Sequence, residues 1–395
     1  MCSSRTVLTK GVRWFIGSDY PCFLNFNSIF RSSQSYTVCF AVPSPTLCLT
    51  SFAALFPIVN SSIFAAMKKT IALVTGGFTG ERVVSLKSAA VIDSNLDRDR
   101  FNVYKIIIDA DGWFYEAADG SKTAVDKNDF SLTVNGEKIL FDGVFIGLHG
   151  SPGEDGKLQG YFELLNIPYN TCDALTSAIT MNKGYTKAVV DGVPELNIAR
   201  SVQLFSNGTA AVEEVVNSLR FPLFVKPNNG GSSIGMSKVK AAEELPEALN
   251  KAFAEGDQVL VEEFIKGREF TIGIYKGKDG IKVLPATEII PSEQYEYFDF
   301  EAKYTTGATN EITPGRMTED EKARVERVVE KAYKKLNCRG VVRIDYILQE
   351  GTDDFYFIEV NTVPGQTENS IIPQQVRAIG RTIKDFYTEL LEVSL

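Results

Sequence analysis

The feature that most constrains the fold is the alternation of short apolar runs with helical segments after residue 67. Buried strands are predicted at residues 71–74, 103–108 and 144–148, and a helix is predicted at residues 84–96. Short apolar strands that alternate with helices favour a parallel sheet with helices on its faces. The sequence therefore predicts an α/β domain up to about residue 170.

Residues 1–66 differ from the rest in cysteine content and charge. They hold four of the six cysteines (Cys2, Cys22, Cys39 and Cys48) but one acidic residue, Asp19. Prolines interrupt the uncharged stretch at residues 40–66, so we expect no membrane-spanning helix there. Serine-rich, acid-poor segments are typical of transit peptides, whereas Met67 followed by two lysines is typical of a bacterial start. Both a targeting segment and translated upstream sequence stay open, and the fold prediction excludes this stretch.

The charge and cysteine contents of the chain narrow its partners and compartment. The 41 lysines and arginines against 50 aspartates and glutamates give a net charge of −9. Nucleic-acid binders usually carry a basic excess, so no nucleic-acid partner is expected. Only Cys172 and Cys338 fall after residue 66, which suits a reducing cytoplasm. The single histidine, His149, argues against a histidine-rich zinc site.

Residues 171–395 continue the alternation of helices and strands. Helices are predicted at residues 174–190, 211–219, 241–254 and 319–336, and near the C-terminus. Strands are predicted at residues 223–225, 258–262, 269–275, 281–285, 341–348 and 355–360. Residues 290–316 show no clear period, and a long irregular loop in a compact domain is usually functional or disordered.

The last two predicted strands, within residues 341–360, are expected to pair as a hairpin that gathers polar side chains. Side chains two residues apart on a strand share a face, so Arg343 projects with Asp345 and Glu359 with Asn361. If the two strands pair, three oxygen ligands and one guanidinium can lie together at one place. Such hard oxygen ligands suit Mg²⁺ or Mn²⁺, which usually also bind substrate phosphates. A surface hairpin with alternating polar residues is the alternative.

Two further segments have the composition of nucleotide-binding elements. Lys226 ends a predicted strand and precedes a Gly/Ser/Asn-rich loop at residues 228–235, where backbone amides could approach phosphate oxygens. This loop is not a Walker A motif, and a plain turn is the alternative. Glu262, Glu263 and Glu269 could accept hydrogen bonds from an adenine amino group and ribose hydroxyls. A solvated acidic edge is their alternative.

His149 follows the predicted strand at residues 144–148. Ligands in α/β sheets bind at the C-terminal ends of strands, which favours a functional histidine. A lone histidine is, however, more often structural.

Taken in order, these motifs resemble those of the D-alanine–D-alanine ligase family of ATP-grasp enzymes, over residues 68–393. The motifs are Gly76-Gly77-x-x-x-Glu81-Arg82-x-x-Ser85, Leu148-His149-Gly150, Gly153-Glu154-Asp155-Gly156-x-Leu158-Gln159-Gly160, Lys226-Pro227, Gly231-Ser232-Ser233-x-Gly235, Glu301-Ala302-Lys303-Tyr304, Arg343-x-Asp345 and Glu359-x-Asn361-Thr362-x-Pro364-Gly365. Three positions depart from the family pattern. Val83 stands where an acid is frequent, Asn182 where aspartate is common, and Gln366 where Met, Leu or Phe is usual.

The resemblance implies an ATP-grasp fold in three parts. These are an N-terminal parallel α/β domain (67–170), a small central α+β domain (171–265) and a C-terminal α+β domain (266–395) with a lid loop at residues 290–316. It implies a cytoplasmic homodimer with two Mg²⁺ or Mn²⁺ ions per site.

The implied reaction joins two D-alanines for peptidoglycan synthesis. ATP would phosphorylate the carboxylate of the first D-alanine, and the amine of the second would then displace phosphate. A D-alanine–D-lactate ligase is one alternative, which Tyr304 argues against because lactate-type relatives usually differ there. Another ATP-grasp carboxylate–amine ligase and a nucleotide-binding regulatory protein with a dead site are the others.

The roles that the resemblance implies fall into four groups. Metal ions would be bound by Asp345, Glu359 and Asn361. ATP would be bound by Lys183, Lys226, Ser233, Glu262, Glu263, Ile265, Glu269 and Lys303. The D-alanines would contact Glu81, His149, Ser370 and Ile371. The catalytic residues would be Glu81, Ser232, Tyr304, Arg343, Gly365 and Ser370. Among these, Glu81, Ser232 and Tyr304 would form a hydrogen-bonded triad, while Arg343 and the Gly365 N–H would stabilise the oxyanion.

Overall fold

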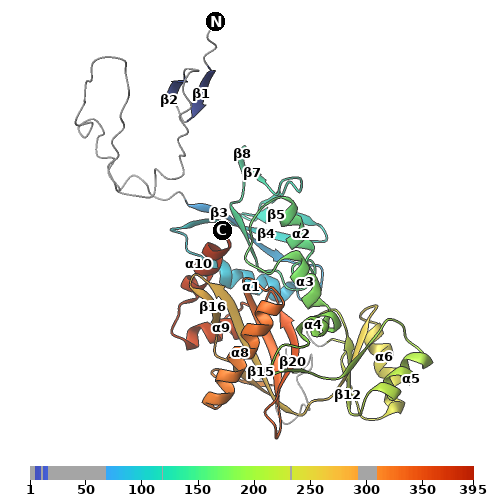
Figure 1. Cartoon of the computed structure of the whole chain (residues 1–395). Coiled ribbons are helices and arrows are strands. Elements are labelled where there is room, and N and C mark those ends of the chain that lie inside the picture. The colour runs from blue at the N-terminus through green and yellow to red at the C-terminus, as the bar shows by residue number, and fades with distance from the viewer. Residues whose placement is uncertain (1–4, 10–11, 17–67, 118, 232–233, 292–308) are drawn as a thin grey trace. The chain divides into compact units, whose positions relative to one another are not determined.

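The computed structural model describes residues 5–9, 12–16, 68–117, 119–231, 234–291 and 309–395 (Figure 1). The chain divides into two units, residues 1–64 and 65–395. In the first unit, β1 (Arg5–Thr9) pairs antiparallel with β2 (Val12–Ile16). None of the helices in the described ranges is long and apolar enough to span a bilayer.

The second unit begins with a five-stranded sheet in the order β6-β5-β4-β3-β9. As predicted, β3 (Lys69–Gly76) pairs in parallel with β4 (Phe101–Asp109) and β9 (Gly143–Ile146), and α1 (Arg82–Asn95) connects the first two strands.

Several elements of this region were not predicted. They are β5 (Gly112–Glu116), β6 (Lys122–Ala124), β7 (Leu132–Val134), β8 (Glu137–Ile139) and α2 (Lys157–Leu164). The strands β5 and β6 extend the sheet antiparallel, so it is mixed rather than purely parallel. All five residues of β5 are half-buried, which leaves no alternation for a sequence pattern to reveal.

A separate four-stranded antiparallel sheet lies in the middle of the chain, in the order β11-β14-β12-β13. Its strands are β11 (Ser201–Leu204), β12 (Leu223–Pro227), β13 (Ser237–Val239) and β14 (Val259–Glu263). Two helices pack on it with their own apolar core, α5 (Thr209–Ser218) and α6 (Leu245–Phe253). The predicted helix at 241–254 begins as a 3₁₀ turn (Ala242–Glu244) and becomes α-helical only at Leu245.

The C-terminal part is built on a seven-stranded sheet in the order β10-β20-β19-β15-β17-β18, with β16 paired to β15. Its strands are β10 (Leu196–Ile198), β15 (Gly267–Gly277), β16 (Gly280–Val283), β17 (Thr287–Pro291), β18 (Thr309–Ile312), β19 (Val341–Gln349) and β20 (Phe355–Asn361). The strands β17 and β18 frame residues 292–308, which lie outside the described ranges and contain most of the predicted lid.

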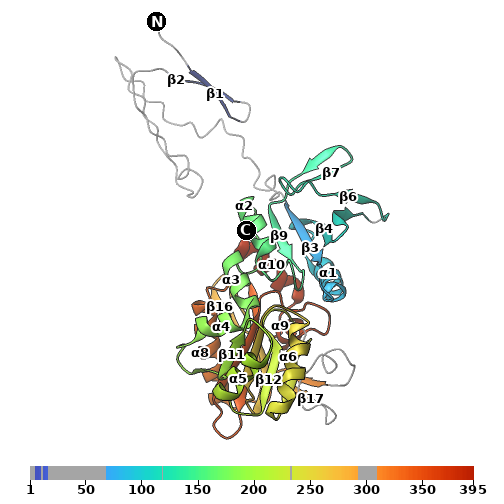
Figure 2. The same ribbon diagram turned by 90° about the vertical axis from the view of Figure 1, so that its right-hand side faces the viewer.

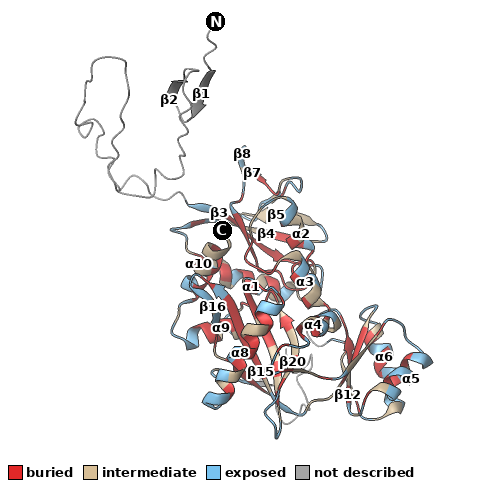
Figure 3. Cartoon of the chain, in the orientation of Figure 1, coloured by how far each residue is buried: buried red, intermediate tan, exposed pale blue. Residues whose placement is uncertain are grey.

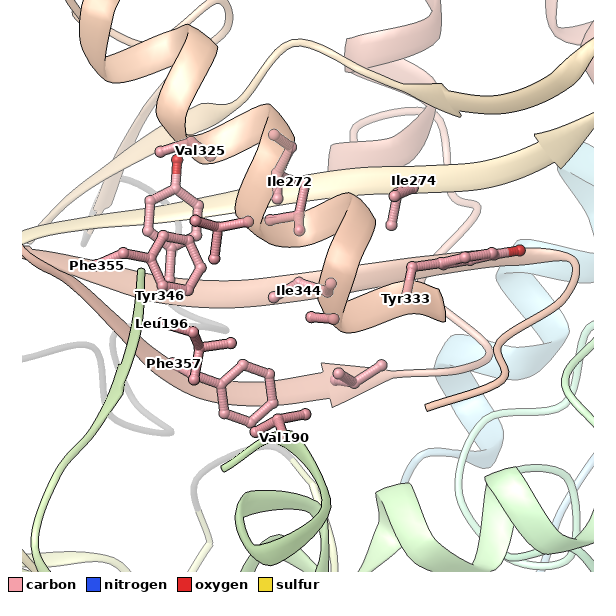
Figure 4. Packing of buried hydrophobic residues seen from close by; sticks show 14 of the residues in the cluster. Val190, Leu196, Ile272, Ile274, Val325, Tyr333, Ile344, Tyr346, Phe355 and Phe357 are labelled. Atoms are coloured by element: carbon pink, nitrogen blue, oxygen red, sulfur yellow. The ribbon is translucent and has the colours of Figure 1, made fainter. Parts of the chain in front are cut away.

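Among its described residues, this part also holds the helices α8 (Glu319–Lys335), α9 (Ile371–Ala378) and α10 (Ile383–Ser394). The helix α8 begins with a capping box between Thr318 and Glu321. Its Val325 belongs to one buried core with Ile272 of β15 and Ile344 of β19, and the helix lies across this face of the sheet (Figure 4).

The predicted helix at residues 174–190 is two helices, α3 (Ala174–Met181) and α4 (Lys183–Val190). Asn182 between them has an extended backbone, and its side chain accepts the Tyr185 N–H at 3.0 Å. Asparagine is a favoured N-cap because its side chain satisfies such an unpaired N–H group. The break therefore places Lys183 at the start of a new helix.

Residues 172–198, which the sequence prediction groups with the central domain, pack with the C-terminal sheet. Strand β10 pairs in parallel with β20, and Cys172, Val190 and Leu196 join the apolar core under α8. A different core joins the N-terminal sheet to α10 (Figure 2). Buried residues concentrate in the strands, and exposed ones on the outer helix faces (Figure 3). The three-domain division itself stays a proposal.

Candidate active site

The predicted hairpin of β19 and β20 is confirmed. The two strands pair antiparallel with Arg343 opposite Asn361 and Asp345 opposite Glu359. Apolar residues of β19 alternate with these polar ones and are buried on the other face, among them Ile344. The four polar side chains therefore stand together on one face of the sheet, where α8 does not cover them.

Arg343 and Asp345 form a bidentate ion pair on this face. The Arg343 Nε donates to Asp345 Oδ1 at 2.8 Å, and Nη2 donates to Oδ2 at 2.8 Å. The Asn361 amide also donates to Asp345 Oδ2, at 3.2 Å, and the Thr271 hydroxyl donates to Oδ1. Burial alone would lower the pKa of the Arg343 guanidinium, but Asp345, Glu359 and nearby Glu154 raise it above its ordinary value. The cation is therefore permanent.

Lys183 connects this hairpin to the glycine-rich loop. Its ammonium donates to the Gly230 carbonyl at 2.6 Å and lies 3.3 Å from Glu359 Oε2. Because Lys183 begins α4, the break at Asn182 determines where this cation lies. A lysine and a predicted metal ligand thus meet beside the loop that was expected to approach phosphate.

Lys226 forms part of a buried charge cluster that sequence reasoning found only in part. The Glu262 carboxylate makes ion pairs with both Lys226 and Lys187, and all three side chains are almost fully buried. Burial would raise the pKa of Glu262, but the two ammonium groups outweigh it and lower that pKa to about 2. Lys187 was missed, although it lies one helical turn after Lys183, a spacing that puts both on one helix face. Burial and the neighbouring Lys226 lower the pKa of Lys187, although Glu262 opposes this shift.

The other predicted adenosine ligands surround the same end of the site. The Glu263 side chain accepts the Arg220 backbone N–H at 3.0 Å. Ile265 lies just before β15 and Glu269 lies within that strand, and both line the cavity described below. Their role toward ATP stays a prediction.

Both ring nitrogens of His149 have protein partners. Nδ1 lies 2.7 Å from the Val363 carbonyl oxygen and Nε2 lies 2.8 Å from the Ser88 hydroxyl. Burial lowers the pKa of His149, so the ring is neutral. Because a carbonyl can only accept, Nδ1 carries the proton and Nε2 accepts from Ser88. The ring ties the end of β9 to α1 and to the turn after β20, which leaves no ring nitrogen for the predicted substrate contact.

Glu154 is a site residue to which sequence reasoning gave no role. Its carboxylate accepts the Gly150 N–H at 2.7 Å and the Val363 N–H at 3.1 Å. Burial and the neighbouring Glu81 raise the pKa of Glu154 to about 8. It belongs to the quoted motif at residues 153–156, but one of its two partners, Val363, lies 209 residues away in sequence.

The carboxylate of Glu81 lies between two glycine segments. A Cβ atom built on Gly150 would lie 2.6 Å from Glu81 Oε2, and one on Gly231 would lie 2.9 Å from Oε1. An added Cβ at either position would force the Glu81 side chain to shift, and at Gly150 the positive φ of 69° also favours glycine. Ser232, Ser233, Lys303 and Tyr304 lie outside the described residues, so the predicted triad stays a prediction.

The turn after β20 leads into α9. Ser370 immediately precedes that helix, and its hydroxyl accepts the Thr367 N–H at 2.9 Å and bonds the Thr367 hydroxyl at 2.7 Å. A Cβ atom on Gly365 would lie 2.9 Å from the Ser370 Oγ, so glycine allows this close approach. Ile371 is the first residue of α9.

A cavity of about 1320 Å³ collects residues from all three parts of the second unit. It is larger than the roughly 300–1,000 Å³ of most small-molecule pockets, which leaves room for a nucleotide and a second substrate. The predicted site residues that line it are Glu81, Lys183, Lys226, Glu262, Glu263, Ile265, Glu269, Asp345 and Glu359. His149, Arg343, Asn361, Gly365, Ser370 and Ile371 do not line it. Arg343 and Asn361 instead adjoin it through Asp345.

Comparisons with known proteins agree with this arrangement. The family model described as D-ala D-ala ligase N-terminus matches residues 70–172, and the one described as D-ala D-ala ligase C-terminus matches residues 192–392. A D-alanine–D-alanine ligase of Phocaeicola vulgatus is 46% identical over 326 residues, which are 82% of this chain and 99% of that protein. One of Porphyromonas gingivalis is 41% identical over 332 residues, 83% of this chain and 99% of that protein.

Solved structures of similar proteins confirm the predicted ATP-grasp fold. The VanG D-Ala:D-Ser ligase of Enterococcus faecalis has a TM-score of 0.75 at 31% identity, with 83% of this chain and 100% of that one covered. A D-alanine–D-alanine ligase of Bacillus anthracis complexed with ATP has a TM-score of 0.65 at 28% identity, with 82% and 97% covered. Because the family models and the relatives match almost all of residues 70–392, this chain belongs to the D-alanine–D-alanine ligase family.

Proposed function

We propose that this protein uses ATP to join two D-alanines into D-alanyl-D-alanine for peptidoglycan synthesis. The observation that carries this proposal is the complete polar face of the β19–β20 hairpin beside Lys183. Arg343, Asp345, Glu359 and Asn361 are all present and in register there. A nucleotide-binding protein without catalytic activity would not need all four of these side chains together.

Two cationic positions are suited to the phosphates of ATP. Lys183 lies at the N-terminus of α4, where helix N–H groups also favour anions, and it is next to the glycine-rich loop. Lys226 belongs to the buried cluster with Glu262 and Lys187 and lines the same cavity. We propose that these lysines hold the phosphates in line with the carboxylate of the first D-alanine.

The donor set of the hairpin fits the divalent metal that ATP-dependent ligases use. Asp345 and Glu359 offer carboxylate oxygens toward the cavity, and Asn361 offers an amide oxygen beside them. In the described ranges no three His, Cys, Asp or Glu residues gather into a metal site. The Asn361 amide oxygen is the proposed third protein ligand. When bound, Mg²⁺ or Mn²⁺ would neutralise phosphate charge. Two ions per site is the proposed stoichiometry.

The reaction would proceed in two steps. A carboxylate oxygen of the first D-alanine attacks the γ-phosphorus, and ADP leaves. The uncharged amine of the second D-alanine then attacks the acyl carbon, which gives a tetrahedral oxyanion. Phosphate leaves, and the amine nitrogen loses a proton. Arg343 and the Gly365 N–H are proposed to stabilise that oxyanion, since fixed donors aimed at developing negative charge often provide much of an enzyme's rate enhancement.

Other features implied by the family resemblance are part of the same proposal. Glu81 would bind the ammonium of the first D-alanine, and Ser370 and Ile371 would contact the second. A homodimer and a cytoplasmic location also stay predictions.

A D-alanine–D-serine ligase is a second candidate, because the VanG D-Ala:D-Ser ligase shares this fold with a TM-score of 0.75. With ATP, D-alanine and equal D-lactate or D-serine, we expect D-alanyl-D-alanine to be the main product near neutral pH. Tyrosine carries no positive charge, whereas a cation at position 304 would favour the hydroxyl of D-lactate over an ammonium. D-serine attacks through its amine as D-alanine does, so only the product analysis separates these two substrates. The measurement is product analysis by mass spectrometry, with phosphate release from D-alanine alone as the reference.

The pH dependence of that competition gives an internal control. Between about pH 6 and 9, which spans typical α-amino titration, acidification should lower dipeptide formation more than depsipeptide formation. The reason is that only the amine loses its nucleophilic form by protonation. A majority of D-alanyl-D-lactate or D-alanyl-D-serine at neutral pH would contradict the assigned substrate.

Residues 1–66 are expected to be dispensable for this activity. The family match begins at residue 70, and the described site lies wholly in the second unit. A protein that begins at Met67 should therefore have the kcat and KM values of the full chain. The measurement is steady-state phosphate release by both proteins at equal concentration. A large loss on truncation would give the segment a role in folding or catalysis.

A further inference from the structure

Gln366 makes a set of buried hydrogen bonds in the turn after β20. Its side chain is only 5% exposed. The Nε2 group donates to the Pro364 carbonyl at 3.1 Å, and Oε1 accepts from the Tyr387 hydroxyl of α10 at 3.0 Å. Its backbone N–H donates to the Ser88 hydroxyl of α1 at 3.2 Å. Gln366 thus connects the turn to α1, near the start of the second unit in sequence, and to α10, at its end.

The same network continues on the other side of the turn. Ser88 donates to Nε2 of His149, and Nδ1–H of that ring donates to the Val363 carbonyl. The Val363 N–H in turn donates to Glu154. The carbonyl groups of Val363 and Pro364 and the N–H groups of Val363 and Gln366 therefore all have hydrogen-bond partners within the protein.

The Gly365 N–H lies between these restrained groups. Within the described residues it donates no hydrogen bond to the protein. A donor held in place before the reaction stabilises developing negative charge better than one that must reorient. The arrangement has the form expected of a preorganised oxyanion donor.

We infer that Gln366 is a positioning residue for the Gly365 N–H. This inference rests on the proposed function. Gln366 does not line the cavity, so it acts through the turn and not on the substrate. Its amide restrains the peptide carbonyl that precedes Gly365, while Tyr387 keeps the amide oriented. The inference also accounts for a polar residue at a position where the family usually has an apolar one.

The variant Gln366→Met tests this role because it keeps the side-chain length and removes both hydrogen bonds. We expect kcat to fall on the order of tenfold, since a small misplacement of a catalytic group is costly. KM for ATP should stay unchanged. Tyr387→Phe should lower kcat in the same direction but less, and the double variant should resemble Gln366→Met alone, because both changes disrupt one unit.

Tyr333→Phe is the matched control. Tyr333 is also buried, and its hydroxyl donates to the Gly340 carbonyl at 2.8 Å, away from the turn. This variant should lose thermal stability as Tyr387→Phe does, yet keep the kcat of the wild-type protein. Equal kcat losses in Tyr387→Phe and Tyr333→Phe would show that the hydrogen bonds of Gln366 affect only the stability of the protein, which would contradict the inference.

Amide hydrogen exchange gives a readout that does not depend on activity. In Gln366→Met the peptide containing residues 362–367 should exchange faster than in the wild type, whereas Tyr333→Phe should leave it unchanged. Unchanged exchange in that peptide, or wild-type kcat in Gln366→Met, would overturn the inference. Failure of the wild-type protein to form the dipeptide would overturn the proposed function instead, and the exchange result would still decide whether Gln366 restrains the turn.

Discussion

Replacing Arg343 with alanine is expected to lower kcat about a hundred- to thousandfold, or about 2.7–4 kcal/mol of transition-state stabilisation. The guanidinium is held by two 2.8 Å bonds to Asp345, and its raised pKa keeps it charged at any working pH. The charge that it would stabilise exists only during the reaction. Its loss should therefore lower turnover with little change in the apparent affinity for ATP.

Two further variants make the Arg343 result interpretable. Arg343→Lys keeps the positive charge but cannot make the bidentate pair, so its kcat should fall between those of the wild type and Arg343→Ala. Arg339→Ala is the control, because Arg339 is exposed near the start of β19 and binds the Tyr169 hydroxyl. Thermal melting would verify that each variant is folded. An Arg343→Ala protein that changes only in ATP affinity would place this arginine elsewhere in the mechanism.

Replacing Glu359 with glutamine is expected to lower turnover severely and to shift the Mg²⁺ requirement to higher concentration. The change keeps the shape of the side chain but removes a carboxylate that lies opposite Asp345 and 3.3 Å from Lys183. A neutral amide is a weaker ligand for a hard cation than a carboxylate. The measurement is phosphate release across a Mg²⁺ titration.

A binding measurement separates loss of metal affinity from loss of catalysis in this variant. Mn²⁺ binding in the presence of ADP, followed by electron paramagnetic resonance, should weaken in Glu359→Gln. Glu326→Gln on the exposed side of α8 serves as the control and should behave like the wild type. Wild-type turnover and wild-type Mn²⁺ binding in Glu359→Gln would contradict the metal assignment.

The hairpin shows how much of the site local sequence could predict. Side chains alternate along a strand, so the spacing of Arg343 and Asp345 and of Glu359 and Asn361 was enough to place each pair on one face. That the two pairs lie directly opposite each other depends on the strand register. The pairing next to the turn, with Tyr346 opposite Phe357, would continue to Asp345 opposite Ile358; an irregularity between Asp345 and Tyr346 shifts the register by one residue and brings Asp345 opposite Glu359. Local sequence did not predict this shift.

The break at Asn182 was missed although its signal is local. The residues on both sides continue a helical pattern, and that pattern outweighed the preference of asparagine for an N-cap. The strand β5 was missed for the opposite reason. All of its residues are half-buried, so buried and exposed side chains do not alternate along it. The break matters for the site because Asn182 determines where Lys183 lies.

The sequence by itself determined the alternation of strands and helices, the polar face of the hairpin and the family to which the chain belongs. These depend on patterns that repeat within a few residues or on ordered motifs. Only the tertiary structure decided the partners of Glu154, Lys187, Gln366 and His149. Each of these four binds groups from distant segments, as His149 does with Val363 across 214 residues. Such contacts form because packing of the cores brings remote segments together, and no local pattern encodes which buried polar groups will then meet.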